Sequence, residues 1–141
     1  MGTRSLTKVY NDESKPICTI YRHMDGYPSR HGQVLADWLA QKTIVNGIGS
    51  TWPGKDEGKQ QANGMEDLAA QLVCYLKTDS EIGGIYLYPP NTHDLGQDYS
   101  YHILLHNGEL MLKVKSGRKI LSQGFPKDFH GLALEAKEEQ P

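Results

Sequence analysis

The sequence predicts one α+β domain in which an antiparallel sheet packs helices on one face. Strand-like runs are grouped at residues 3–23 and 83–121, and two helical patterns lie between them. Strands grouped in this way favour an antiparallel sheet over an alternating α/β fold. A length of 141 residues suits one domain. We expect residues 1–134 to form it and residues 135–141 to be a charged, flexible tail.

The first half predicts a hairpin followed by two helices. Residues 3–10 and 17–23 are rich in β-formers and flank the turn sequence NDESK. Ser29 is the expected N-cap of a helix that runs to about Lys42. Asn63 and Glu66 form a capping pattern for a second helix that runs to about Lys77. Apolar residues at the 3.6-residue period predict the buried faces: Val34, Leu35, Trp38 and Leu39 in the first helix, and Met65, Leu68, Leu72, Tyr75 and Leu76 in the second.

The clearest signal is the Asn107-Gly108 hairpin turn. It predicts that His106 lies opposite Glu109, and the same register pairs Tyr101 with Val114, Ile103 with Leu112 and Leu105 with Leu110. These three apolar pairs predict the core face. The other face is mixed, and its His102, Lys113 and Lys115 are interpreted as residues that keep an exposed sheet face soluble. Residues 119–121 predict a further edge strand.

Residues 43–64 show no periodicity, are rich in glycine and contain a Trp52-Pro53 turn. A structureless connection of this length is either a functional loop or disordered. Trp52 favours an ordered loop that closes over a ligand, because an exposed tryptophan in a floppy loop is unfavourable.

Composition narrows the function classes. A formal net charge of -2 argues against a general nucleic-acid binder. Cys18 and Cys74 form no C-x-x-C motif, so we expect two buried, reduced thiols. The chain opens without an apolar signal segment and contains no membrane-length apolar run, so we expect a cytoplasmic protein.

Metal and cofactor chemistry has little support in the sequence. His102 and His106 are four residues apart on one strand, about 13 Å, which is too far to share an ion. Neither a nucleophile elbow nor a phosphate-binding loop of the G-x-x-x-x-G-K type occurs. We therefore expect no cofactor and no metal, and a binding protein rather than an enzyme.

The stretch YRHMDGYPSRHG, residues 21–32, is the candidate site. Arg22 ends a strand, while Arg30 and His31 occupy the first turn of the next helix. Cations are unfavourable at a helix N-terminus, so their presence indicates a nearby anion, either Asp25 or a ligand phosphate or carboxylate. Tyr21 and Tyr27 are candidates to stack on a planar group, which points to a nucleotide-type ligand. Three alternatives stay open: a self-satisfied structural turn, a protein-contact surface, and a general-base pair of His23 or His31 with Asp25.

The motifs GTRSLT (2–7), YRHMDGYPSRHG (21–32) and TIVNGIG (43–49) make the chain resemble a family of small phage and prophage proteins. The resemblance is specific over the first third and implies origin rather than mechanism. Carried over residue by residue, it marks Arg4, Tyr21, Arg22, Asp25, Gly26, Tyr27, Pro28, His31 and Gly32.

These observations favour a non-enzymatic phage protein that binds a nucleotide-like or other anionic small molecule in the host cytoplasm. Sequestration of a host immune second messenger is one such role. The alternatives are an inhibitor of a host protein and a small hydrolase or phosphodiesterase that uses His31 and Asp25. We expect a homo-oligomer, because a small domain buries a sizeable ligand poorly alone. The predicted ligand-binding residues are Arg4, Tyr21, Arg22, Asp25, Tyr27, Arg30, His31 and Trp52.

Overall fold

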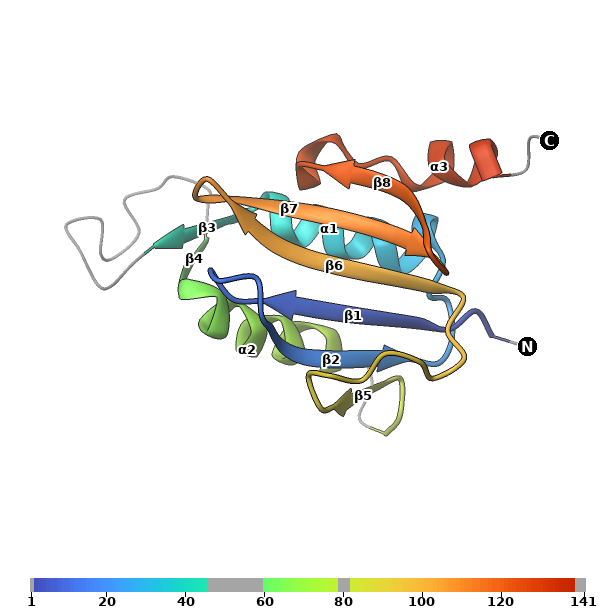
Figure 1. Cartoon of the computed structure of the whole chain (residues 1–141), viewed down its shortest axis with the longest axis horizontal. Coiled ribbons are helices and arrows are strands. Elements are labelled where there is room, and N and C mark those ends of the chain that lie inside the picture. Colours follow the sequence, from blue (N-terminus) through green and yellow to red (C-terminus); the bar gives the residue numbers. More distant parts are fainter. Residues whose placement is uncertain (1, 46–59, 79–81, 139–141) are drawn as a thin grey trace.

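The fold is a six-stranded sheet with helices behind it (Figure 1). The structure, a computed structural model, describes residues 2–45, 60–78 and 82–138. The strand order is β5-β2-β1-β6-β7-β8, and every neighbouring pair is antiparallel except β1 with β6. The α+β class and the predominantly antiparallel sheet are as predicted. Among the described residues, the helices are too short or too polar to span a bilayer.

The N-terminal hairpin consists of β1 (Ser5–Tyr10) and β2 (Pro16–Arg22). Its turn is stabilised by the Asn11 side chain, whose Oδ1 accepts hydrogen bonds from the backbone N–H groups of Glu13 and Lys15. The edge strand β5 (Ile85–Tyr88) pairs with β2, so that Tyr86 lies opposite Tyr21 and Ile85 lies opposite Arg22. One end of β2 therefore lies directly beside the start of β5.

The second half forms the meander of β6 (Tyr99–His106), β7 (Glu109–Ser116) and β8 (Lys119–Gly124). The predicted register of β6 and β7 is confirmed at every pair. The parallel junction of β1 with β6 was not predicted. It arises because residues 89–98 return the chain to the end of the sheet at which β1 starts, so that β6 begins beside Ser5 and runs alongside β1.

The helical layer starts with a single π-turn, Pro28–Gly32, followed by α1 (Gln33–Ala40). The second helix, α2 (Gly64–Lys77), ends where predicted. Neither predicted cap side chain bonds as expected: Ser29 lies inside the π-turn, and Asp67 rather than Glu66 accepts from the Asn63 backbone N–H. The core joins the two helices to alternate residues of the central strands, including Leu35, Leu39, Leu68, Leu72, Tyr101, Ile103 and Leu112.

Two segments differ from the prediction. The ends of the connection at 43–64 are ordered, since β3 (Lys42–Val45) and β4 (Gln60–Asn63) form a two-stranded parallel sheet. Trp52 lies outside the described residues. At the C-terminus, a short 3₁₀ turn, Pro126–Asp128, leads into α3 (Gly131–Glu138), so residues 135–138 are helical rather than part of a tail. The Glu135 carboxylate accepts from the Ser29 backbone N–H, which fastens α3 to the π-turn.

The cysteines are both free thiols, but their environments differ from the expected burial. Cys18 is half-buried on β2, and Cys74 is exposed on α2. Burial raises the pKa of the Cys18 thiol, so it stays protonated at neutral pH.

Candidate functional site

An open cleft of about 500 Å³ lies at the junction between β2 and the π-turn. This junction cleft is bounded by the end of β2, the start of the helical layer, the last turn of α2 and the start of β5. Its volume is in the range of small-molecule sites. The residues that line it are Arg22, His23, Met24, Asp25, Arg30, Val34, Tyr75, Leu76, Gly84, Ile85 and Tyr86.

Two guanidinium groups and one carboxylate dominate the electrostatics of the junction cleft. Arg22 donates from Nε to the Met24 carbonyl oxygen at 2.7 Å. Arg30 approaches Asp25 with an N–O distance of 3.7 Å, and the two side chains are 61% and 45% exposed. A long, exposed ion pair of this kind contributes little to stability, about 0–1 kcal/mol. Within the described residues Arg22 has no carboxylate partner, so the charged groups leave an excess of positive charge.

The turn that presents these charges is held rigidly against β1. Asp25 takes a positive φ of 60°, and its carbonyl accepts from the His31 N–H at 3.3 Å. The next residue, Gly26, donates to the Thr3 carbonyl at 2.9 Å and accepts from the Tyr101 hydroxyl at 2.7 Å. A Cβ at Gly26 would lie 2.8 Å from the side chain of Ser5, so only glycine fits. Arg22 and Arg30 therefore project from a fixed frame.

His31 lies in the core and does not line the junction cleft. Its side chain is 1% exposed, its Nε2 is 2.8 Å from the Thr7 hydroxyl, and its ring meets that of Tyr101 edge-on at 5.3 Å. Burial, followed by the charge of Arg22, lowers the pKa of His31 to about 3. The ring is therefore neutral at physiological pH. Nδ1 has no hydrogen-bond partner in the described part of the chain.

The spacing of His31 in the sequence explains why its side chain is buried. His31, Leu35 and Leu39 are spaced four residues apart, and all three are buried. His31 thus continues the apolar stripe of α1 by one turn. The general-base pair of His31 with Asp25 is not formed, since the Asp25 carboxylate approaches Arg30 and the His31 ring approaches Thr7.

The other predicted residues lie outside the junction cleft. Tyr21 projects from the opposite face of β2 to Arg22 and contacts the rings of Tyr86 and Tyr88 at 6.1 Å each. Arg4 lies beside the start of β6, where its N–H donates to the Asp98 carboxylate at 3.0 Å. Tyr27 is half-buried at the start of the π-turn. Of the predicted set, the junction cleft brings together Arg22, Asp25 and Arg30.

Two aromatic residues of the junction cleft were missed. Tyr86 is 48% exposed and borders the cleft because β5 pairs with β2, a pairing that no local sequence signal specifies, but the register places its side chain on the face of Tyr21 rather than on that of Arg22. Tyr75 was expected in the buried face of α2 but is 45% exposed, and its ring stacks on Trp38 at 5.6 Å. His23, the neighbour of Arg22, lines the cleft while its Nδ1 contacts the Tyr21 hydroxyl at 2.9 Å.

This arrangement suits recognition of an anion that carries an apolar or aromatic group. Guanidinium forks bind phosphate and carboxylate oxygens in pairs, and the exposed part of the Tyr75 ring offers an apolar surface. In the ranges 2–45, 60–78 and 82–138, no three His, Cys, Asp or Glu side chains gather closely enough to hold a metal ion. No family model, no curated protein and no solved structure matches this chain.

Proposed function

We propose that the chain binds a nucleotide-like or other anionic small molecule in the junction cleft and releases it chemically unchanged. One observation carries this proposal: Arg22 and Arg30 border an open cleft of about 500 Å³ in which Asp25 is the one carboxylate among the described lining residues. A phosphate group would give both guanidinium groups a divalent partner in place of one distant, exposed carboxylate oxygen.

The rigid frame favours binding with little reorganisation. Gly26 is fixed to Thr3 and to Tyr101, and Arg22 is held by its own bond to the Met24 carbonyl. Side chains that are already ordered lose less conformational entropy when a ligand binds. Breaking the Arg30–Asp25 pair is inexpensive because that pair is exposed and long.

The walls of the junction cleft favour a ligand with a base or another planar group. Tyr75 is 45% exposed in the lining of the cleft, while Ile85 and Leu76 supply buried apolar surface. Stacking of a nucleobase on an aromatic side chain contributes about 1–3 kcal/mol. Phosphate on the arginines and a planar group beside Tyr75 would use both the charged and the apolar part of the cleft.

The resemblance to phage and prophage proteins suggests where such binding would act. A phage protein that holds a nucleotide without turning it over would lower the free concentration of a host signal. We therefore extend the proposal to sequestration of a nucleotide second messenger of host defence.

Calorimetry against cyclic and linear nucleotides tests the proposal. We expect one member of the panel to bind, and Arg22→Gln or Arg30→Gln to weaken that binding by about 1.5–3 kcal/mol, the usual value of a charge-assisted hydrogen bond. Arg118→Gln is the matched control, because Arg118 is exposed in the turn between β7 and β8, away from the cleft. Absence of heat with every nucleotide, or full affinity in both cleft variants, would remove the proposal.

Recovery of the ligand separates binding from turnover. After incubation at a stoichiometric ratio, the protein is heat-denatured and the released nucleotide is analysed by mass spectrometry. We expect an unaltered mass. A hydrolysed product that the Arg22→Gln protein fails to form would instead show an enzyme at this cleft.

A host-protein inhibitor is the second candidate, and the outer edge of β5 favours it, since β5 pairs with β2 alone among the described strands. Leu87 is 63% exposed and Ile82 is 95% exposed beside this edge strand. Unpaired strand edges are common sites of strand addition by a partner. Leu87→Lys would abolish partner capture from a host lysate while leaving nucleotide binding intact.

A further inference from the structure

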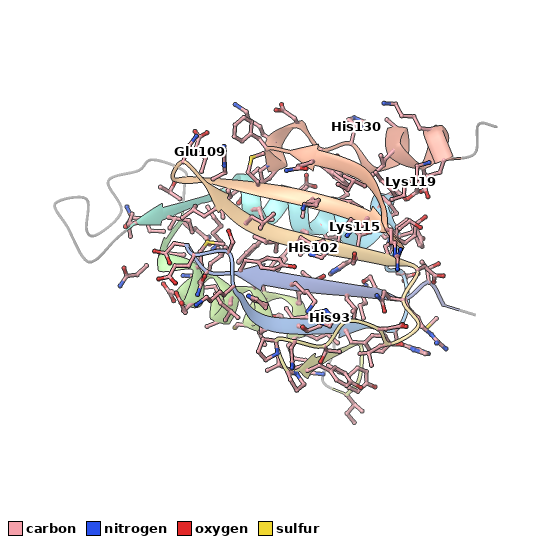
Figure 2. The ribbon with its side chains drawn as sticks, in the orientation of Figure 1. His93, His102, Glu109, Lys115, Lys119 and His130 are labelled. Carbon is pink, nitrogen blue, oxygen red and sulfur yellow. The ribbon has the colours of Figure 1, made fainter. Side chains whose placement is uncertain are left out.

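A second cluster of cations lies on the face of the sheet opposite to α1 and α2. Strand register places Lys8, His102 and Lys113 side by side on β1, β6 and β7, and Lys115 is two residues from Lys113 on the same face. Figure 2 shows His102 and Lys115 over these central strands. We call Lys8, Lys113 and Lys115, which surround His102, the lysine patch.

Lys8 is a buried ammonium group without a negatively charged partner. Its residue is only 5% exposed, and its Nζ donates to the Pro90 carbonyl at 2.8 Å and to the Thr19 hydroxyl at 3.1 Å. Both acceptors are neutral, and none of the carboxylates in the described residues forms an ion pair with Lys8. Burial lowers its pKa. Buried charges are normally paired, so a buried ammonium group with only neutral acceptors among the described residues favours an anion bound beside it.

The lowered pKa of His102 indicates that the charges around its ring are positive. Its Nδ1 is 2.7 Å from the Tyr10 hydroxyl and its Nε2 is 2.9 Å from the Ser100 hydroxyl, so both ring nitrogens are engaged. The pKa of His102 falls to about 4 through burial, and then through the charges of Lys115, Lys113 and Lys8. The groups that act on this ring from β1 and β7 are therefore all positive.

The lysine patch is confined to a small area, which limits the ligand that fits. Toward the hairpin tip the same face continues with the pair Leu104 and Met111 and then with His106 and Glu109. Along β7, Glu109 lies four residues from Lys113, about 13 Å away. A compact ligand with several charges matches three lysines that all act on the one ring of His102, with the Lys8 ammonium on the Thr19 side of that ring. A long polyanion would also meet Glu109 and a chain of net charge -2.

Lysines that only keep a sheet face soluble extend into water, and such lysines are expected to be well exposed. Here Lys113 and Lys115 are half-buried and Lys8 is buried. Like charges that all act on one buried ring cost free energy unless an anion offsets their repulsion.

We propose that the lysine patch is a second site, independent of the junction cleft, which binds a compact phosphate group of diphosphate or triphosphate size. The two sites lie on opposite faces of the sheet, since Lys8 pairs with Thr19 and the face alternates before Arg22 is reached. Lys8, Lys113 and Lys115 supply charge, and Ser100 and Tyr10 hold the His102 ring beneath the anion.

Titration of inorganic pyrophosphate in a phosphate-free, low-salt buffer tests the proposal by calorimetry. We expect the double variant Lys113→Gln/Lys115→Gln to bind pyrophosphate more than about tenfold more weakly, the effect of losing one charge-assisted contact or more. Lys119→Gln is the matched control, because it removes an exposed lysine at the start of β8 outside the patch. Lys119→Gln should retain full affinity. Arg22→Gln should retain the binding event that the double lysine variant weakens, and it should lose only pyrophosphate bound at the junction cleft.

A second readout follows the His102 ring by NMR. Pyrophosphate in the lysine patch would offset the positive field of the three lysines, so the pKa of His102 should rise on binding in the unsubstituted chain. No binding of pyrophosphate, unchanged affinity in the double variant, an equal loss in Lys119→Gln, or an unmoved His102 titration would each overturn the proposal. Tighter binding of a single-stranded oligonucleotide than of pyrophosphate would overturn the compact-ligand part of it.

Discussion

Acidification should destabilise this protein mainly through His31. The folded-state pKa of His31 is about 3, against an ordinary value of 6.5, because the ring is fully buried. Between these two values the unfolded chain binds a proton that the folded chain does not. The contribution of His31 to the unfolding free energy is therefore fully present above pH 6.5, and it is lost progressively as the pH drops toward 3. The slope is about 1.4 kcal/mol per pH unit for one such proton.

The two pKa values of His31, unfolded and folded, give the size of the stability loss expected in an experiment. Lowering the pH from 7 to 5 should remove about 2 kcal/mol of unfolding free energy through His31 alone. His102, whose pKa is lowered to about 4, acts in the same direction, but it is half-buried and solvent screens part of its effect. A variant is therefore needed to isolate the share of His31.

Urea unfolding at pH 7 and pH 5, followed by circular dichroism, measures this share. His31→Gln retains a polar group for the Thr7 hydroxyl but cannot titrate, so its stability loss on acidification should be smaller than that of the unsubstituted chain by about 2 kcal/mol. His130→Gln removes an exposed histidine and should keep the full pH dependence. Equal pH dependence in His31→Gln and the unsubstituted chain would refute the reasoning, since His31 would then be free to protonate in the folded state.

Two further predictions concern the turn that presents the arginines. Gly26→Ala should lower the unfolding free energy by about 1–3 kcal/mol, because the new Cβ would lie 2.8 Å from the Ser5 side chain. Gly124→Ala is the control, because nothing lies within 4 Å of a Cβ there. It should change the unfolding free energy by less than about 0.5 kcal/mol. Equal urea midpoints for the two glycine variants would show that the turn can move away. Tyr101→Phe should cost about 1–3 kcal/mol, because it leaves the buried Gly26 carbonyl without its 2.7 Å hydrogen bond. Tyr99→Phe removes a hydroxyl that bonds the exposed Glu138 carboxylate and should cost under about 1 kcal/mol by the same assay, so an equal or larger loss there would contradict the distinction.

Local patterns were sufficient wherever one short motif determined the geometry. The Asn107-Gly108 turn permits one hairpin register, and with it every pair from Ser100 to His106 could be assigned. The order of strands in the sheet could not be predicted in this way. The parallel contact of β1 with β6 and the contact of β5 with β2 join segments that are far apart in the sequence, and no turn type specifies such contacts.

The sequence predicted where the candidate site lies, but only some of the residues that line it. Arg22, Asp25 and Arg30 converge because a strand end and a helix start are adjacent in the chain. His31 belongs to the buried stripe of α1, which its spacing to Leu35 indicates in retrospect. Tyr86 was beyond prediction, because its position depends on β5 adding to the far side of β2.

Core residues hold the turn that carries Arg22 and Arg30, so a core substitution can weaken ligand binding without touching the junction cleft. Tyr101, His31 and Thr7 make no contact with the junction cleft, yet they fix the turn from which Arg22 and Arg30 project. Tyr101→Phe should therefore weaken nucleotide binding as well as stability, with an affinity loss smaller than that of Arg22→Gln. A nucleotide on Arg22 would also offset part of the positive charge that lowers the pKa of His31. Bound ligand should consequently reduce the loss of stability only as the pH approaches 3, in the unsubstituted chain but not in His31→Gln, and this difference distinguishes coupling through His31 from simple stabilisation by mass action.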